Sequence, residues 1–352
     1  APELGHTDSE KLILLMESKK KVDFYFPNST KDVKPIISLF RNFSSPIKII
    51  RSKTVDEMFF EQKKESDPFN KWDTIQQIFL LALTERDEEK NKKNIKFLIK
   101  SLDEILSSDE LSEAFKAVIF TPPSDNSICE SLIKSNILID PESIFQKKSS
   151  LLKNIALSLD EKLLNKFYKI KETIPIGEYD IDPISIGKRK FKNLLQLWIS
   201  QTNTKNDWDQ MLSRSFFESN NMTDKIFSLK SLLLRGKHQS KIALSNFYDQ
   251  FKDDSIALDK WISVQIESKE FFSKYNETIT SMVKSFLHES FFSRSNPNRV
   301  YALLGTFFFK NMREFHRGDN SESYEIWVNE ILVLDKLNSQ LAARLTRSFD
   351  GW

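Results

Sequence analysis

The chain of 352 residues is longer than a single typical domain, so we expect two units or one extended array. Acidic and basic residues are interspersed and the formal net charge is +2, which argues against nucleic acid as a partner. A single cysteine excludes an intrachain disulfide and fits the reducing cytoplasm, and the sequence predicts neither a signal peptide nor a membrane span.

Residues 1–50 differ from the rest of the chain. Short runs rich in β-forming residues occur at 12–16, 22–26 and 47–50, and prolines interrupt any helix there. We interpret this part as the remnant of a β unit. Because two or three strands bury too little surface to be stable alone, they must pack on the later part of the chain or belong to a missing sheet.

From about Asp67 almost to the end, the pattern is helical. Helix starts repeat one chemistry, in which a short polar side chain caps free backbone N–H groups and proline opens the first turn. These starts are Asp67-Pro68, Asp140-Pro141, Asp182-Pro183 and Asn296-Pro297. Amphipathic stripes run between them, and the clearest residues are Trp72, Ile75, Ile78, Phe79, Ala82, Leu194, Leu197, Trp198, Leu258, Trp261, Ile262, Gln265, Trp327, Ile331 and Leu334.

Helices of about ten to twenty residues joined by short polar loops pack as antiparallel hairpins. Many such pairs in series form an α-solenoid, in which each pair buries its apolar face on its neighbours. We therefore predict a mainly α protein, a right-handed α-solenoid of ARM/HEAT-like helix hairpins with a short β remnant at the N-terminus. A compact multi-helix bundle is the alternative, and the length favours the solenoid because single cores stop growing near this size.

No pattern in the chain predicts a catalytic or metal site. Hydrolytic zinc often takes two histidines at i and i+4 of a helix plus a carboxylate. The histidines are widely separated, at His6, His238, His288 and His316. The chain has no nucleophile elbow and no phosphate-binding glycine loop. Cys129 lies on a predicted helix, where a buried structural thiol is favoured over a nucleophile.

Two further features have structural interpretations. The densest basic run, 188–190, is expected to be a solvated first turn of a helix rather than a phosphate site. The doubled phenylalanines are expected to belong to the core, because proteins that bind single strands interleave aromatic residues with a basic groove. These runs are Phe59-Phe60, Phe216-Phe217, Phe271-Phe272, Phe291-Phe292 and Phe307-Phe308-Phe309.

Several segments are more specific than a generic helix. They are Phe217-Glu-Ser-Asn-Asn-Met-Thr-Asp, Ala257-Leu-Asp-Lys-Trp-Ile-Ser-Val-Gln, Ser295-Asn-Pro-Asn-Arg-Val-Tyr-Ala-Leu-Leu-Gly-Thr-Phe, Phe315-His316 and Leu341-Ala-Ala-Arg-Leu. With Phe43-Ser-Ser-Pro-Ile-Lys-Ile and Asp67-Pro-Phe-Asn-Lys-Trp-Asp, they resemble the C-terminal part of bacterial-type aminopeptidase N, in the gluzincin zinc metallopeptidase family. The resemblance runs from about residue 10 to Arg344.

The resemblance implies that the chain is the back part of a larger enzyme that removes N-terminal residues from short peptides. It assigns residues 1–50 to the end of a small β-sandwich domain and its linker, and 51–352 to a helical-repeat domain truncated at its C-terminal end. The partners would be the missing N-terminal and catalytic domains of the same polypeptide, which carry the zinc and general-base motifs. The chain alone is expected to hold no cofactor and to be inactive, with zinc bound in the full-length protein.

In that family, the helical domain caps the active-site chamber and lines part of the substrate cavity. Arg344 matches an arginine that faces this cavity, where a guanidinium could hold peptide carbonyls or a carboxylate, and a surface helix arginine is the alternative. Arg299 and Tyr301 are further candidates, although Arg299 also fits a helix-end role. The segment 220–224 is interpreted as a loop and helix N-cap. We expect a concave face of mixed polar and cationic residues, and an exposed apolar patch.

A stand-alone α-solenoid that binds protein partners, without enzymatic activity, is the alternative function. It would need capping repeats with polar outer faces at both ends. The chain instead begins in β-like sequence and ends within a helical array, which speaks against it. Its start at Ala1, without a methionine, suggests an excised or processed chain.

Overall fold

A computed structural model of the chain describes residues 13–23, 36–47, 49, 53–174, 179–202, 206–236, 238–268, 278–318 and 321–350. The chain divides into two compact units, 1–39 and 40–352. The β remnant is not seen in the part of 13–49 that the structure describes, since no strand occurs there. The rest of the predicted strand segments lies outside the described residues.

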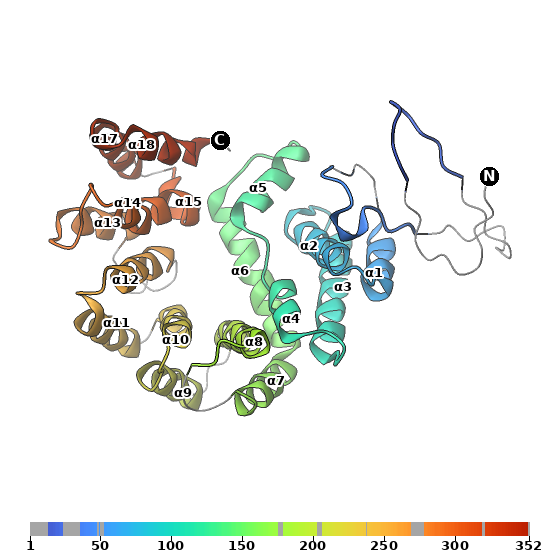
Figure 1. Ribbon diagram of the computed structural model, residues 1–352, viewed down its shortest axis with the longest axis horizontal. Helices are drawn as coiled ribbons and strands as arrows, with labels where there is room; N and C mark the ends of the chain where they lie inside the picture. The colour runs from blue at the N-terminus through green and yellow to red at the C-terminus, as the bar shows by residue number, and fades with distance from the viewer. Residues whose placement is uncertain are drawn as a thin grey trace. The chain divides into compact units, whose positions relative to one another are not determined.

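The second unit is helical, and the predicted mainly α solenoid is confirmed (Figure 1). The helices are η1 (Arg41–Phe43), α1 (Val55–Lys64), α2 (Pro68–Thr84), α3 (Glu88–Ser107), α4 (Glu113–Ile119), α5 (Asp125–Lys134), α6 (Pro141–Ser158), α7 (Asp160–Glu172), α8 (Pro183–Ser200), α9 (Asn206–Phe217), α10 (Met222–Arg235), α11 (His238–Phe251), α12 (Ser255–Glu267), α13 (Ile279–His288), α14 (Pro297–Val300), η3 (Tyr301–Gly305), α15 (Thr306–Lys310), α16 (Met312–Phe315), α17 (Ser321–Leu337), α18 (Ser339–Thr346) and η4 (Arg347–Phe349).

The predicted helix starts are confirmed by side-chain caps. At each start the polar side chain accepts a hydrogen bond from a backbone N–H two or three residues on, and proline occupies the first turn. The capping residues are Asp67 for α2, Asp140 for α6, Asp182 for α8 and Asn296 for α14. Local sequence therefore sets where these helices begin, and packing then decides how they associate.

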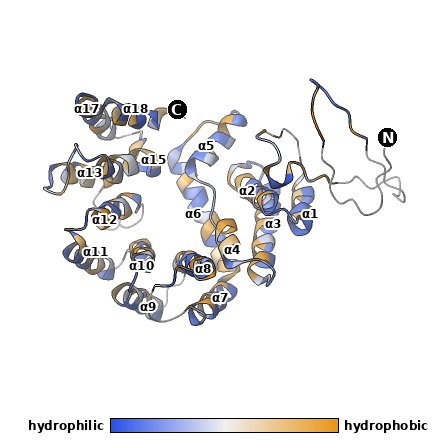
Figure 2. Ribbon diagram, in the orientation of Figure 1, coloured by the Kyte–Doolittle hydropathy of each residue, from blue (hydrophilic) through white to orange (hydrophobic). Residues whose placement is uncertain are grey.

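Neighbouring helices pack in pairs along the chain, as in α2 with α3, α9 with α10 and α17 with α18. Hydrophobic and hydrophilic residues alternate along the helices (Figure 2), and the buried apolar side chains of these helices form one core cluster. One pairing skips along the sequence, because α4 packs on α8. This contact is close, since a Cβ added at Gly187 would lie 2.9 Å from the Cβ of Ala114.

The helical unit also contacts itself across a long stretch of sequence, at a junction that we call the clasp. There α16 packs on α6. Arg313 forms a forked ion pair with Glu142, with N–O distances of 2.5 and 3.2 Å, and its guanidinium lowers the pKa of that carboxyl. The Cys129 Sγ lies 3.6 Å from the Met312 Sδ. Repeats in a simple solenoid contact only their neighbours, so the clasp is an addition to that architecture.

The doubled phenylalanines divide between core and surface. Phe216, Phe307 and Phe308 are buried, whereas Phe60 and Phe217 are exposed. Consecutive helical residues point in different directions, so one member of a pair can pack while the other faces solvent. The pair at 271–272 lies outside the described residues. The core prediction is therefore confirmed for Phe216, Phe307 and Phe308, and it is wrong for Phe60 and Phe217.

The prediction that the basic run 188–190 is a solvated turn is wrong for Arg189, whereas Lys190 is exposed. Arg189 is buried, stacks on the Tyr179 ring at 4.1 Å and donates to the carbonyl oxygen of Asp180. Arg189 is buried because α8, which carries it, packs against α4, α7 and α10 and is therefore covered on several sides. A guanidinium in the middle of that helix must therefore find partners inside the protein.

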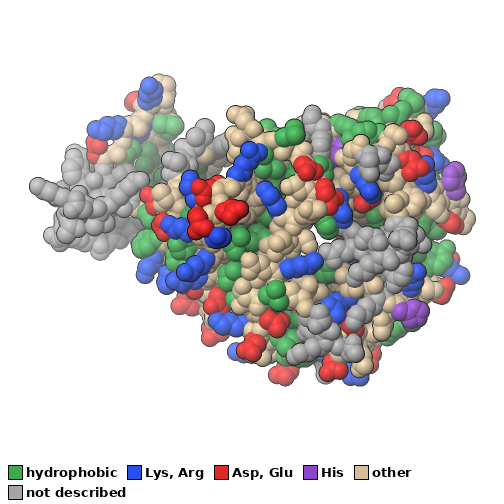
Figure 3. Space-filling view, turned by 180° about the vertical axis from the view of Figure 1, so that it is seen from behind, with side chains coloured by type: hydrophobic (Ala, Val, Ile, Leu, Met, Phe, Trp, Pro, Cys, Tyr) green, Lys and Arg blue, Asp and Glu red, His purple; other side chains and the backbone are tan. Residues whose placement is uncertain are grey.

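The surface shows no separation of charge on the face in Figure 3, where Lys and Arg side chains are mixed with Asp and Glu side chains. Among the residues that the structure describes, no helix has both the length and the apolar character that crossing a bilayer requires.

Candidate functional site

Two helices each place a stripe of polar and apolar side chains along one pocket. On α12 the stripe contains Ile256, Asp259, Lys260, Ser263, Val264 and Glu267. On the helix formed by α14, η3 and α15, it contains Asn298, Tyr301, Ala302, Gly305, Thr306, Phe309 and Lys310. Steps of three and four residues keep such side chains on one helix face. Together with Ile226 and Lys230 of α10, the stripes line a pocket of about 640 Å³, which we call the cationic pocket.

The second of these helices contains a π-helical turn, η3, over Tyr301–Gly305. The N–H of Thr306 donates to the carbonyl oxygen of Tyr301, five residues back. A Cβ at Gly305 would lie 3.0 Å from the Tyr301 ring, so glycine gives the ring its room. Single π-helical turns occur often at functional sites, and this one places Tyr301 on the wall of the cationic pocket.

A cluster of three charged side chains lies in the cationic pocket. The Glu267 carboxylate pairs with Lys230 at 2.8 Å and with Lys310 at 2.9 Å. Burial raises the pKa of Glu267, but the two ammonium groups oppose it and leave this pKa below its ordinary value. Glu267 is therefore ionised at neutral pH. Lys230 and Lys310 remain partly exposed, so their ammonium groups can also reach a ligand.

A second pocket, of about 340 Å³, adjoins the first and is mainly apolar; we call it the apolar pocket. Its apolar lining residues come from the inner sides of four helices and one loop: Pro122, Phe145, Leu152, Leu194, Leu197, Trp198, Leu233, Leu234 and Val264. The Trp198 indole N–H donates to the carbonyl oxygen of Phe120 at 3.1 Å, which fixes this wall. Lys230, Val264 and Glu267 line both pockets, so the two lie side by side and share part of a wall.

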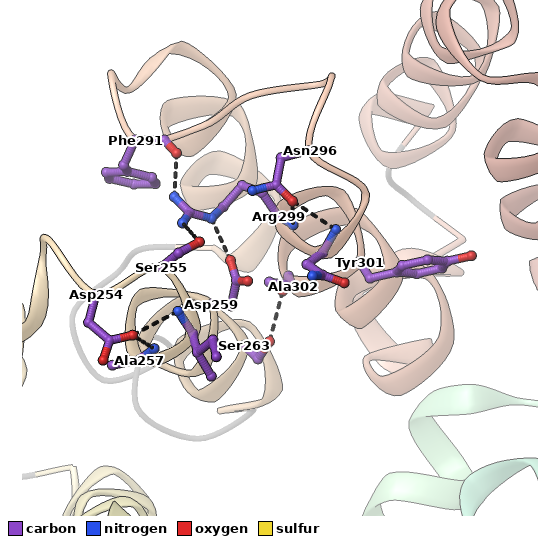
Figure 4. Close-up of polar contacts among 12 residues, drawn as sticks. Asp254, Ser255, Ala257, Asp259, Ser263, Phe291, Asn296, Arg299, Tyr301 and Ala302 are labelled. Atoms are coloured by element: carbon purple, nitrogen blue, oxygen red, sulfur yellow. Dashed lines mark hydrogen bonds and ion pairs between the residues drawn. The ribbon is translucent and has the colours of Figure 1, made fainter.

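The structure separates the three candidate residues named from the sequence. Tyr301 lines the cationic pocket, and Figure 4 shows its ring pointing away from the Arg299 cluster. Arg299 is buried and bonds to the Asp259 carboxylate, the Phe291 carbonyl oxygen and the Ser255 hydroxyl (Figure 4). Arg344 is exposed on α18 and lines neither of the two pockets. A role in a substrate cavity stays a prediction for all three.

The segment 220–224 is a loop and N-cap, as predicted. The Asn221 side chain accepts from the Asp224 N–H at 2.9 Å and caps α10. The Asp224 carboxylate in turn accepts from the Asn193 amide at 2.7 Å and pairs with Lys192 at 3.0 Å. These bonds join α8 to α10, so Asn221 and Asp224 have structural roles at the start of α10.

The described residues do not fit a zinc site. No group of three or more His, Cys, Asp or Glu side chains among them could hold a metal ion. His316 is buried, its Nδ1 lies 3.0 Å from the Tyr324 hydroxyl, and burial lowers its pKa to about 4. Cys129 is a buried thiol, as expected, and burial raises its pKa to about 11, which disfavours the thiolate that a nucleophile needs.

Sequence reasoning missed the lysines and the glutamate of the cationic pocket. A signal was present on α12, where Asp259, Lys260, Ser263 and Glu267 recur at helical spacing beside an apolar stripe. Such a stripe is also typical of a solvated helix face, so spacing alone could not identify a pocket. Lys230 of α10 and Lys310 of α15, which pair with Glu267, are distant from it in sequence and approach it only in the folded chain.

The chain is similar in sequence to one domain family and to parts of known aminopeptidases. The family described as "Domain of unknown function (DUF3458_C) ARM repeats" matches residues 55–352. Aminopeptidase N of Haemophilus influenzae is 24% identical over 316 residues, which cover 89% of this chain and 34% of that protein. Aminopeptidase N of Escherichia coli is 25% identical over 318 residues, with 88% and 34% covered. The chain thus spans about a third of the length of these relatives.

The fold agrees with that of a solved structure. The crystal structure of Legionella pneumophila aminopeptidase A in complex with aspartic acid superposes with a TM-score of 0.73 at 24% identity, covering 88% of this chain and 36% of that one. The resemblance to the C-terminal part of aminopeptidase N, expected from the sequence segments, is confirmed. The chain belongs to the DUF3458_C family of ARM-repeat domains.

Proposed function

We propose that this helical unit is the non-catalytic C-terminal part of a zinc-dependent aminopeptidase, in which it caps the active-site chamber and controls the access of peptides. The observation that carries the proposal is the similarity to aminopeptidase N over 88% of the chain, against 34% of that enzyme's length. Catalysis, zinc and the pocket for the N-terminal residue would then belong to other domains of the same polypeptide. Residues 1–50 would be the end of the preceding domain and its linker, and the setting would be peptide catabolism in the cytoplasm.

The helical unit supports this role with a polar and cationic interior and an exposed apolar surface. The cationic pocket supplies hydrogen-bond donors and ammonium groups that suit peptide carbonyl and carboxylate oxygens. On α17 the side chains of Val328 and Leu332, four residues apart and therefore on one helix face, are exposed although they are apolar. Apolar side chains gathered on a surface are typical of an interface with another domain.

The test combines metal analysis with an aminoacyl-anilide assay on the 352-residue chain and with the coding sequence upstream of Ala1. We expect no stoichiometric zinc and no turnover from the chain alone, and an upstream reading frame that encodes the H-E-x-x-H zinc helix. Zinc at one equivalent with turnover would contradict the proposal. A native transcript that starts at Ala1, with no peptidase coding sequence before it, would favour the scaffold function instead.

A further inference from the structure

We propose that the two adjoining pockets form a peptide-binding site that selects an acidic residue next to a bulky apolar residue. The apolar side chain would occupy the apolar pocket, and the carboxylate would meet the lysines of the cationic pocket. This inference deepens the proposed function, because it names a class of peptide that the helical unit would hold. It concerns binding by this chain alone and does not depend on catalysis.

The two pockets adjoin, which lets one short segment occupy both. Lys230, Val264 and Glu267 line both pockets, so the pockets lie within reach of two neighbouring side chains of one peptide. Adjacent residues of an extended peptide point their side chains to opposite sides, about 3.3 Å apart along the chain. Two neighbouring side chains that diverge would therefore enter one pocket each.

The charges of the cationic pocket favour an anion. Lys230, Lys260 and Lys310 line it, with Asp259 and Glu267 as the carboxylates among its described lining residues. The buried Arg299 guanidinium already neutralises Asp259. Glu267 alone therefore balances three ammonium groups. Each ammonium has three N–H donors, so Lys230 and Lys310 can bond Glu267 and still donate to a second carboxylate.

The apolar pocket excludes a charged side chain, because the charges at its rim are already paired. Lys148 and Asp125 form an ion pair of 2.7 Å there, and Lys230 pairs with Glu267. The remaining wall is largely leucine, phenylalanine and tryptophan. A volume of about 340 Å³ accepts a side chain as large as phenylalanine or leucine, whose transfer from water favours binding.

The experiment measures binding of blocked, fluorescently labelled hexapeptides to the 352-residue chain by anisotropy. Acetylated N-termini and amidated C-termini leave the acidic side chain as the ligand's carboxylate. The probe contains Phe-Glu at its centre, and the matched peptides contain Phe-Gln or Ser-Glu. We expect each matched peptide to bind about tenfold more weakly than Phe-Glu, and added salt to weaken Phe-Glu but not Phe-Gln.

Variants of the chain locate the site. Lys260→Gln and Lys310→Gln should each weaken Phe-Glu about threefold to tenfold and leave Phe-Gln unchanged. Leu197→Trp, which fills the apolar pocket, should weaken both peptides. The matched control is Lys336→Gln, an exposed lysine of α17 that lines neither pocket and should change nothing. Thermal unfolding of each variant shows that it is folded.

Three results would overturn the inference. The first is equal binding of Phe-Glu and Phe-Gln, or no binding of either at about 1 mM. The second is unchanged Phe-Glu binding in folded Lys260→Gln and Lys310→Gln chains. The third is saturable binding of laurate in the absence of peptide binding, which would identify a site for fatty acids. Each can occur whether or not the chain belongs to an aminopeptidase, so failure here leaves the proposed function to its own test.

Discussion

Replacement of Arg299 by methionine separates a structural role from a ligand-binding role. Arg299 is 5% exposed, and its guanidinium bonds to Asp259, Phe291 and Ser255, which join α12, the loop after α13 and α14. Methionine keeps the volume of the aliphatic stem but leaves the Asp259 carboxylate without its buried partner. Removing one member of a buried pair costs about 3 to 5 kcal/mol. Asp259 retains some solvent access, so we take the lower figure.

A loss of about 3 kcal/mol is large compared with the stability of most proteins. In a chain of this size, about 2 °C of Tm is lost per kcal/mol, so we expect Arg299→Met to lower Tm by about 6 °C. Circular dichroism during heating measures this shift. The matched control is Arg344→Met on the exposed face of α18, which should change the free energy of unfolding by less than about 0.5 kcal/mol.

A double-mutant cycle tests whether the Asp259 pair is the cause. Arg299→Met combined with Asp259→Asn should cost less than the sum of the two single changes, by about 1 to 3 kcal/mol. Additive losses would mean that the pair does not couple the two helices. An Arg299→Met chain with unchanged Tm but weakened peptide binding would show that Arg299 serves the ligand, and the structural role would be refuted.

Two other predictions concern the helix contact and the buried histidine. Gly187→Ala should lower Tm although alanine favours helix, because its Cβ would meet Ala114 at 2.9 Å, and a higher Tm would show that α4 moves aside. His316 has a folded pKa of about 4 against 6.5 unfolded, so stability should fall by about 3 kcal/mol as pH drops from 6.5 to 4; urea unfolding of His316→Gln should lack this slope, and an equal slope would assign it to other groups.

The helical architecture could be predicted because its signals are local. Asp67, Asp140, Asp182 and Asn296 cap their helices through bonds that span two or three residues. The sequence could not predict the clasp, because Cys129 and Met312 are far apart in the chain and neither has a property that reveals its partner. Long-range contacts follow from how all the intervening helices pack.

The candidate site was predictable only in part, for a related reason. Tyr301 was named from a resemblance, and the structure places it on the wall of the cationic pocket. Lys230, Glu267 and Lys310 come from three separate helices and read in sequence as ordinary solvated charges. Arg189 was also misjudged from the sequence, because it belongs to a basic run that was expected to be solvated but its guanidinium is buried. Charge patterns do not show which face of a helix is covered, and contacts between helices decide that.

The chain is expected to bind a peptide without cleaving it, and one measurement tests this directly. A Phe-Glu hexapeptide with a free N-terminus is equilibrated with the chain and added zinc. The bound peptide is then recovered, and its mass is measured by mass spectrometry. We expect saturable binding to a single site and recovery of the intact peptide. Absence of binding, or recovery of a peptide shortened by its first residue, would contradict the claim.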